Sequence, residues 1–178
     1  MAAALFGRLD LVGGDDVAEE VSVASAGLLE GGYASPPEVV TVMEELGIDL
    51  SGHSSRQISP ELVVESDVIV GMARRHAREV VLLDGAAWDH TFTLKEFVRR
   101  GDLVGGRGPD EALRVWLDAL HDGRKRTDLV GSSVADDVAD PIGGPLEGYR
   151  KTARELNELV GHAAALLLAP RGIRTLPG

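Results

Sequence analysis

The hydrophobic positions of this chain follow two different spacings, which alternate along its length. Residues 67–72 hold a nearly continuous apolar run, typical of a strand buried on both faces of a parallel sheet. Residues 21–25 alternate and are β-branched, and residues 88–92 form a second short candidate, so both are predicted to be strands. Helical spacing predicts helices over residues 1–9, 36–46, 74–83, 94–100, 110–121 and 146–168, and one short turn from residue 59. Strands alternating with helices indicate an α/β fold with a parallel sheet.

Local signals set the expected ends of these helices. Ser35 stands just before two prolines and is predicted to cap the helix that follows. Gly47 is placed as a stop signal for the same helix. Thr93 and Glu96 have the spacing of a capping box. The glycine-rich residues 101–108 and the polar residues 122–133 are predicted to be loops, and residues 13–16 to be a helix break.

Composition narrows the functional classes. The 178 residues suit one domain, which we place at residues 1–168 with a frayed tail at 169–178. A net charge of −11 argues against binding to nucleic acids and to anionic membranes. The absence of cysteine excludes disulfides and thiolate metal sites. Without a long apolar run or a signal peptide, the sequence predicts a cytoplasmic protein.

The most informative stretch for chemistry lies at residues 136–145, just before the longest predicted helix. Pro141 keeps Asp140 out of the helical region, and Gly143 and Gly144 allow a sharp bend next to it. A carboxyl group held in this way over a cleft suits a general acid. The alternative is that Asp-Pro starts a turn and that the acidic residues cap the next helix.

Five segments in order resemble the low-molecular-weight protein tyrosine phosphatases. They are Ser25-Ala26-Gly27, the segment 45–49 (Glu-Leu-Gly-Ile-Asp), the segment 52–57 (Gly-His-Ser-Ser-Arg-Gln), the buried strand at 67–72, and Ala139-Asp140-Pro141. The resemblance spans residues 1–168, with an enlarged region at 99–133. It implies a three-layer α/β/α fold with strand order 2-1-3-4. It also implies hydrolysis of phosphate monoesters, with a phosphorylated protein or a small phosphate ester as the substrate.

The resemblance also assigns roles to residues. In that family a Cys-x5-Arg-Ser-Pro loop cradles the phosphate, its cysteine attacks phosphorus, and the aspartate of Asp-Pro protonates the leaving atom. The family's acid therefore corresponds to Asp140. His53 matches a histidine that supports the phosphate loop, although a solvated loop histidine is an equal reading. Arg56 is a second candidate for binding, while Ile142 and Gly143 stand where the family often has aromatic residues.

By resemblance, Met1 aligns just after the phosphate loop, so the first, central strand, that loop and its cysteine are expected to be missing. Either the start of the sequence was assigned to an internal methionine, or the protein is a shortened pseudophosphatase. In both cases this 178-residue polypeptide is expected to be inactive. Residues 21–25 and 67–72 should then flank an empty position in the sheet, about 10 Å apart. Such exposed strand edges predict self-association.

Other functions stay open at this point. A non-catalytic module could bind a phosphorylated ligand through Arg56, Arg74 or Arg75, although surface arginines are usually only solvated. An arsenate reductase would need cysteines, which this chain lacks. A metal hydrolase could use the four residues Asp89, His90, Asp137 and Asp140, although they match no known metal-binding spacing. We therefore expect neither a metal nor another cofactor.

Overall fold

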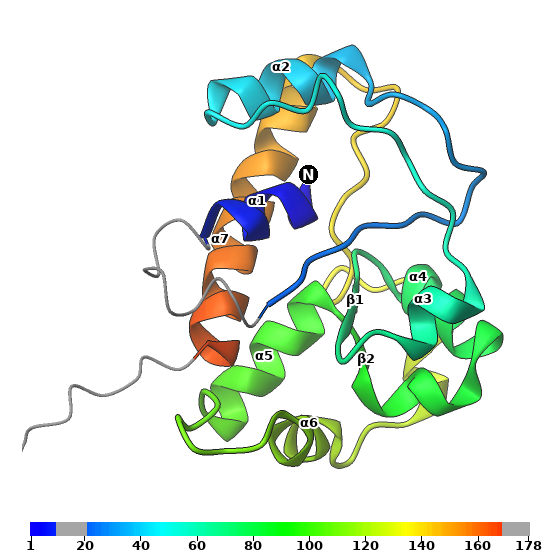
Figure 1. The fold of residues 1–178 in the computed structure, drawn as a ribbon, viewed down its shortest axis with the longest axis vertical. Helices are drawn as coiled ribbons and strands as arrows, with labels where there is room; N and C mark the ends of the chain where they lie inside the picture. Colours follow the sequence, from blue (N-terminus) through cyan, green and yellow to red (C-terminus); the bar gives the residue numbers. More distant parts are fainter. Residues whose placement is uncertain (10–20, 169–178) are drawn as a thin grey trace, which may run out of the picture.

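The computed structural model describes residues 1–9 and 21–168 and has an α/β fold built around a short parallel sheet (Figure 1). Strand β1 (Ile69–Gly71) pairs in parallel with β2 (Thr91–Thr93), and Ile69 lies opposite Thr91. The α-helices are α1 (Ala2–Leu9), α2 (Pro37–Glu45), α3 (Pro60–Val64), α4 (Arg74–Leu83), α5 (Leu94–Val104), α6 (Leu113–His121) and α7 (Leu146–Leu167). Two 3₁₀ helices, η1 (Gly85–His90) and η2 (Arg126–Leu129), lie within connections.

Helices cover both faces of the sheet, as the parallel arrangement requires. Helix α4 contacts β1 and β2 from one side, while α5 contacts them from the other and packs along α7. Figure 1 shows α1 lying across α7, with α2 at the far end of α7 and α6 beneath α5. The predicted α/β fold with a parallel sheet and helical layers is confirmed.

The core is aromatic where the sheet meets α5 and α6. Phe92 of β2 and Phe97 of α5 meet edge to face at 5.7 Å between ring centroids, and Trp116 of α6 continues the row at 5.5 Å from Phe97. All three rings are buried. Edge-to-face geometry lets each ring place its positive edge against a neighbour's negative face. This row fixes α5 and α6 against the end of the sheet.

A buried arginine links β2, η1 and α5. The Arg124 side chain is 0% exposed and donates to both carboxylate oxygens of Glu96, at 2.8 and 3.1 Å. Its guanidinium lies 4.0 Å from the ring centroid of Trp88 and 4.2 Å from that of Phe92. It also donates to the Thr91 carbonyl oxygen at 2.7 Å. The ion pair, the hydrogen bonds and the two aromatic faces together offset the free energy that it costs to remove the guanidinium charge from water.

Several predicted helix ends are confirmed. Gly47 ends α2 with a φ of +76°, a conformation that glycine adopts readily. The short turn predicted from residue 59 is α3, where the structure adds Ser59 as the cap, and the Thr93 hydroxyl accepts from the Glu96 N–H at 3.2 Å. The reciprocal half of that capping box is replaced, because the Glu96 carboxylate bonds to Arg124 and Arg100 instead.

Other expectations were wrong. Residues 21–25 are not a strand, because in the described residues no neighbouring strand pairs with them. The first backbone bridge comes just after this segment, from Gly27 to Gln57. Residues 88–90 belong to η1, so the strand begins at Thr91. Ser35 does not cap α2, since Pro36 occupies that position. Residues 101–104 continue α5, with Gly101 packed against Leu166, where a Cβ would come within 2.6 Å of a side-chain carbon.

The proposed gap in the sheet is only partly tested. Within residues 21–168, β1 has backbone pairing with β2 alone, and the segment 21–25 makes no ladder with it, as the gap requires. Three expectations stay predictions: the strand order 2-1-3-4, the domain limits and the enlarged region at 99–133. The helix break predicted at 13–16 and the tail at 169–178 lie outside the described residues.

Candidate active site

The Asp140 loop (residues 133–145) is attached to the carboxyl end of β1. The Val138 N–H donates to the carbonyl oxygen of Met72, the residue after β1 ends, at 2.8 Å. The Thr152 hydroxyl of α7 holds the Ala139 carbonyl oxygen at 3.2 Å. The loop therefore connects the sheet edge to α7, and it places Asp140 at the edge where ligands of parallel sheets bind. Asp140 therefore lies on a loop at the edge of the sheet where the strand predicted at residues 67–72 ends.

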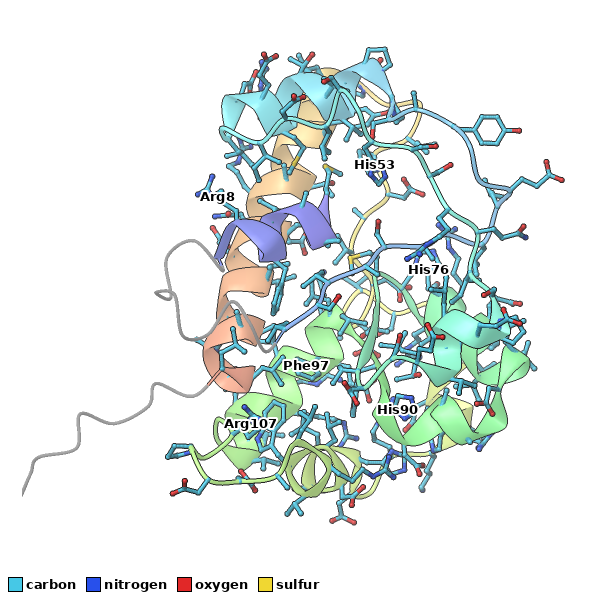
Figure 2. All side chains as sticks on the ribbon, viewed as in Figure 1. Arg8, His53, His76, His90, Phe97 and Arg107 are labelled. Atoms are coloured by element: carbon cyan, nitrogen blue, oxygen red, sulfur yellow. The ribbon has the colours of Figure 1, made fainter. Side chains whose placement is uncertain are left out.

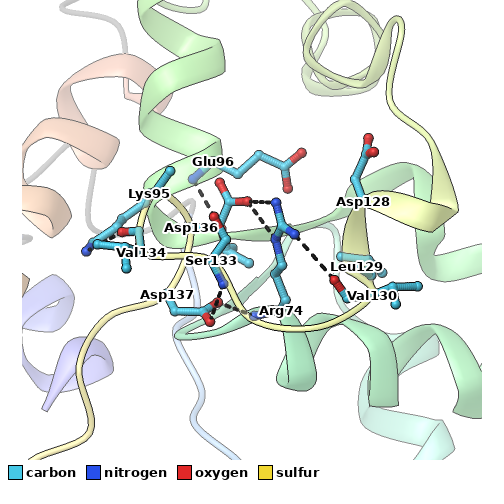
Figure 3. A network of polar contacts seen from close by, with 12 residues as sticks. Arg74, Lys95, Glu96, Asp128, Leu129, Val130, Ser133, Val134, Asp136 and Asp137 are labelled. Atoms are coloured by element: carbon cyan, nitrogen blue, oxygen red, sulfur yellow. Dashed lines mark hydrogen bonds and ion pairs between the residues drawn. The ribbon is translucent and has the colours of Figure 1, made fainter.

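A polar network fixes the first part of the loop (Figure 3). Asp136 is buried and accepts from the guanidinium groups of Arg74, at 2.6 Å, and Arg99, at 2.8 Å. Burial alone would raise the pKa of Asp136, but the hydrogen bonds and charges of the two arginines outweigh it and hold this pKa below its ordinary value. Asp136 is therefore a carboxylate at neutral pH.

Asp137 joins the same loop to the beginning of α4. Its carboxylate accepts from the Arg74 N–H at 2.8 Å and from the Ser133 N–H at 2.9 Å. The first N–H groups of a helix have no partner within the helix, and a carboxylate there also meets the positive end of the helix dipole. Asp137 thus caps α4 from a distant part of the sequence, as Figure 3 shows.

Asp140 itself is half exposed, with 51% of its side chain open to solvent. One carboxylate oxygen accepts from the Arg75 guanidinium at 3.2 Å, and the other accepts from the Ile142 N–H at 3.2 Å. The Arg75 Nε–H in turn donates to Nε2 of His76 at 3.1 Å. A carboxyl group that is accessible but oriented from both sides can exchange a proton with a bound molecule.

The remaining candidate residues are placed differently. His53 and Arg56 lie on the exposed connection between α2 and α3. Figure 2 shows His53 close below α2 and well apart from His90. Arg74 is committed to Asp136, so of the two arginines at the start of α4 only Arg75 reaches Asp140.

The four residues considered for a metal centre are not brought together. Asp89 and His90 precede β2 at the amino edge of the sheet, where His90 and Arg114 line a cavity of about 210 Å³. Asp137 and Asp140 lie at the carboxyl edge, and Asp89 pairs with Arg114 at 3.0 Å. Among the residues that the structure describes, no group of three or more acidic, histidine or cysteine side chains is arranged to hold a metal ion.

Sequence reasoning missed His76 and the Asp136 network. One signal could have found them, because Arg74 and Arg75 both stand in the first turn of α4, where the helix dipole disfavours cations. Two arginines at that place need carboxylate partners from elsewhere, and Asp136 and Asp140 provide them.

The edge of the parallel sheet, the Asp-Pro loop and the basic start of α4 together describe a phosphatase-like α/β protein. Comparison with known proteins agrees, since the family model for low molecular weight phosphotyrosine protein phosphatase matches residues 1–104. A protein-arginine-phosphatase of Geobacillus stearothermophilus is 31% identical over 169 residues, covering 94% of this chain and 86% of that protein. A protein-arginine-phosphatase of Bacillus subtilis is 29% identical, covering 85% of this chain and 79% of that protein.

Solved structures give the same result. A low molecular weight protein tyrosine phosphatase from T. tengcongensis superimposes with a TM-score of 0.63 at 28% identity, covering 90% of this chain and 85% of that one. The chain belongs to the low molecular weight phosphotyrosine protein phosphatase family. Within the described ranges, no helix has both the length and the apolar character that a membrane crossing requires.

Proposed function

We propose that the ligands of this chain are phosphorylated proteins and that Asp140 acts as the proton donor to the leaving atom where a nucleophile is supplied. The observation that carries the proposal is the hydrogen bond from Val138 to Met72, because it holds the Asp140 loop over the carboxyl end of β1. The family's acid stands in an Asp-Pro sequence before the last helix, and Asp140-Pro141 has that position ahead of α7. His53 and Arg56 are weaker candidates for binding, because both are exposed loop residues.

We also propose that the 178-residue polypeptide has no turnover by itself. The family's nucleophile is a cysteine thiolate, and this sequence contains no cysteine. Nucleophile and acid act as a unit, so an acid alone contributes little. The assay is hydrolysis of p-nitrophenyl phosphate and of a phosphoarginine peptide between pH 5 and 7. We expect the rate of buffer alone; turnover that vanadate blocks and Asp140→Ala abolishes would show that the chain holds a nucleophile.

For the substrate, we propose a protein phosphorylated on arginine in preference to tyrosine. Ile142, two residues after Asp140, is 72% exposed, so an aliphatic side chain and Gly143 line the approach to the acid. An aromatic ring there would stack on a phosphotyrosine ring, whereas an aliphatic side chain gives no such preference. Two of the similar proteins are named as protein-arginine-phosphatases. The guanidine nitrogen would take its proton from Asp140 as the P–N bond breaks.

The substrate proposal is tested by ligand binding, which needs no turnover. Peptides that differ only in phosphoarginine, phosphotyrosine or the unmodified residue are titrated calorimetrically into the protein. We expect the phosphoarginine peptide to bind best, and Ile142→Tyr to shift the preference toward phosphotyrosine. Stronger binding of the phosphotyrosine peptide to the native chain would contradict the proposal.

A non-catalytic phosphoprotein-binding role is the second candidate. Arg75 favours it, since its side chain is 56% exposed and its guanidinium could turn from Asp140 to a bound phosphate. In this role Arg75→Gln abolishes peptide binding, while Asp140→Asn leaves it intact or strengthens it. Loss of binding in Asp140→Asn, with binding unchanged in Arg75→Gln, would contradict this role.

We further propose that the chain self-associates through β1. In the described residues β1 is paired on one side only, which leaves backbone groups available to another strand. Sedimentation over a hundredfold range of concentration should show dimers or larger species. A monomer at every concentration, with a sharp two-state melt, would contradict this proposal.

A further inference from the structure

Arg74 and Arg75 are neighbours in the sequence but have different surroundings. Arg74 lies within the Asp136 network, with only 23% of its side chain exposed. Arg75 points to the surface, where it contacts Asp140 of the loop and His76 of its own helix. The helix dipole disfavours a cation in this first turn, so the position of Arg75 depends on these two partners.

We propose that His76 and Arg75 form a positioning chain, in which the neutral imidazole of His76 holds Arg75 and Arg75 holds Asp140. The inference rests on the proposed role of Asp140 as proton donor. Neither His76 nor Arg75 contacts the reacting atoms in this proposal; both act through Asp140. The chain consists of two hydrogen bonds, Arg75 Nε–H to His76 Nε2 at 3.1 Å and Arg75 to Asp140 at 3.2 Å.

The first hydrogen bond defines the proton on His76. An arginine Nε–H can only donate, so Nε2 of His76 must carry a lone pair and the ring proton lies on Nδ1. Burial lowers the pKa of His76, and the charge of Arg75 lowers it further, against the smaller opposing effects of Asp140 and Asp137. These are the charged groups that face the ring, from α4 and from the Asp140 loop. Near neutral pH the imidazole is therefore an acceptor.

The backbone fixes where the imidazole lies. Gly71, the last residue of β1, packs directly against α4, and a Cβ there would come within 3.1 Å of the His76 Cβ and 3.2 Å of the Ala77 nitrogen. That is too close for a larger residue without a shift of the helix. The glycine thus allows α4 to begin next to the sheet edge, and His76 is held at a set distance from the Asp140 loop.

Protonation of His76 breaks the chain. An imidazolium has no lone pair for the Arg75 Nε–H, and its charge repels the guanidinium. Asp140 then keeps only the hydrogen bond from the Ile142 N–H. The acid is accordingly held in one orientation at neutral pH and released as the solution becomes more acidic.

The test is nuclear magnetic resonance on the labelled 178-residue protein. The His76 ring nitrogens report its titration, and solvent exchange of the Arg75 Nε proton reports the first hydrogen bond. We expect slow exchange above the His76 midpoint and at least tenfold faster exchange below it, with the Asp140 carboxyl resonance moving at the same midpoint. Fast exchange at every pH would overturn the proposal.

Three variants make the test specific. His76→Gln supplies an amide oxygen as acceptor, so the Arg75 proton should stay protected with no pH response. Arg75→Gln should remove the response of Asp140 while His76 still titrates. Arg78→Gln is the matched control, because it removes the same charge one turn later from an arginine that faces Glu79. If the Asp140 carboxyl resonance of Arg75→Gln still moved at the His76 midpoint, the positioning chain would be refuted. The catalytic role of Asp140 would not be affected by that result, because it is tested separately by turnover.

Discussion

Two arginine–carboxylate pairs lie near the same small sheet, and they differ in almost every physical respect. Arg124 and Glu96 are 0% and 10% exposed, and two aromatic faces enclose the guanidinium. Arg75 and Asp140 are 56% and 51% exposed and share one contact at 3.2 Å. A buried pair cannot separate without leaving an uncompensated charge, whereas an exposed pair can exchange partners at little cost. The first pair therefore holds the fold, and the second is suited to a ligand.

The largest effect is expected at the buried pair. Arg124→Gln removes the fully buried partner of the Glu96 carboxylate and leaves it only the partly exposed Arg100, which should lower the free energy of unfolding by about 3–5 kcal/mol. Urea denaturation followed by circular dichroism measures this. The double variant Arg124→Met with Glu96→Leu should recover much of the loss, because no charge is left buried. A loss below about 1 kcal/mol in the single variant would mean that the pair is not structural.

Asp136 should show an intermediate effect. Asp136→Asn removes the carboxylate that Arg74 and Arg99 share. Because the Arg99 side chain is half exposed, we expect the free energy of unfolding to fall by only about 1–3 kcal/mol. The Asp140 loop should also become more mobile, seen as faster amide exchange at Val138. Because the folded-state pKa of Asp136 is lowered, its stabilisation is present above the ordinary value of 3.8 and is lost as the pH falls through the folded value. Asp136→Asn should remove that part of the acid sensitivity.

Histidines add a separate pH dependence. Burial lowers the pKa of His76, His90 and His121 in the folded protein from the ordinary 6.5. The unfolded chain binds these protons first, so stability is full above pH 6.5 and declines as the pH falls toward the folded values. Thermal melts between pH 8 and 5 should show this decline. A melting temperature that rises on acidification over this range would contradict the assignment.

The smallest effect on stability is expected at the exposed pair. Arg75→Gln should change the free energy of unfolding by less than about 1 kcal/mol, as is usual for exposed ion pairs. Arg114→Gln is a suitable control, since Arg114 and Asp89 form a pair of similar exposure, 56% and 45%. A loss at Arg75 comparable with that at Arg124 would remove the distinction between the two pairs.

The sequence predicts the parts of this fold that depend on local spacing. The bounds of α4, the short turn that becomes α3 and the cap at Thr93 follow from periodicity and side-chain chemistry. Residues 21–25 have the correct alternation, but a strand also needs a neighbour, and that is not encoded locally.

For the candidate site, too, the sequence predicts what depends on local motifs but not the contacts between distant segments. The position of Asp140 follows from Asp-Pro and the family resemblance. The contacts that hold it and its loop span long stretches of sequence: Arg75 is 65 residues from Asp140, and Arg74 is 62 residues from Asp136. Contacts of this kind arise only when the sheet edge is assembled.

The most direct measurement asks whether Asp140 acts as the proton donor once a nucleophile is supplied. A synthetic peptide with a strand-forming segment and the family's Cys-x5-Arg-Ser-Pro loop is added to the protein, and hydrolysis of a phosphoarginine peptide is followed. The account predicts turnover that falls by about 10²–10⁴-fold in Asp140→Asn. The control Asp102→Asn should leave it unchanged, since that carboxylate is 52% exposed and pairs with His162. Equal turnover in the two variants, or none with the native chain, would contradict the catalytic role of Asp140.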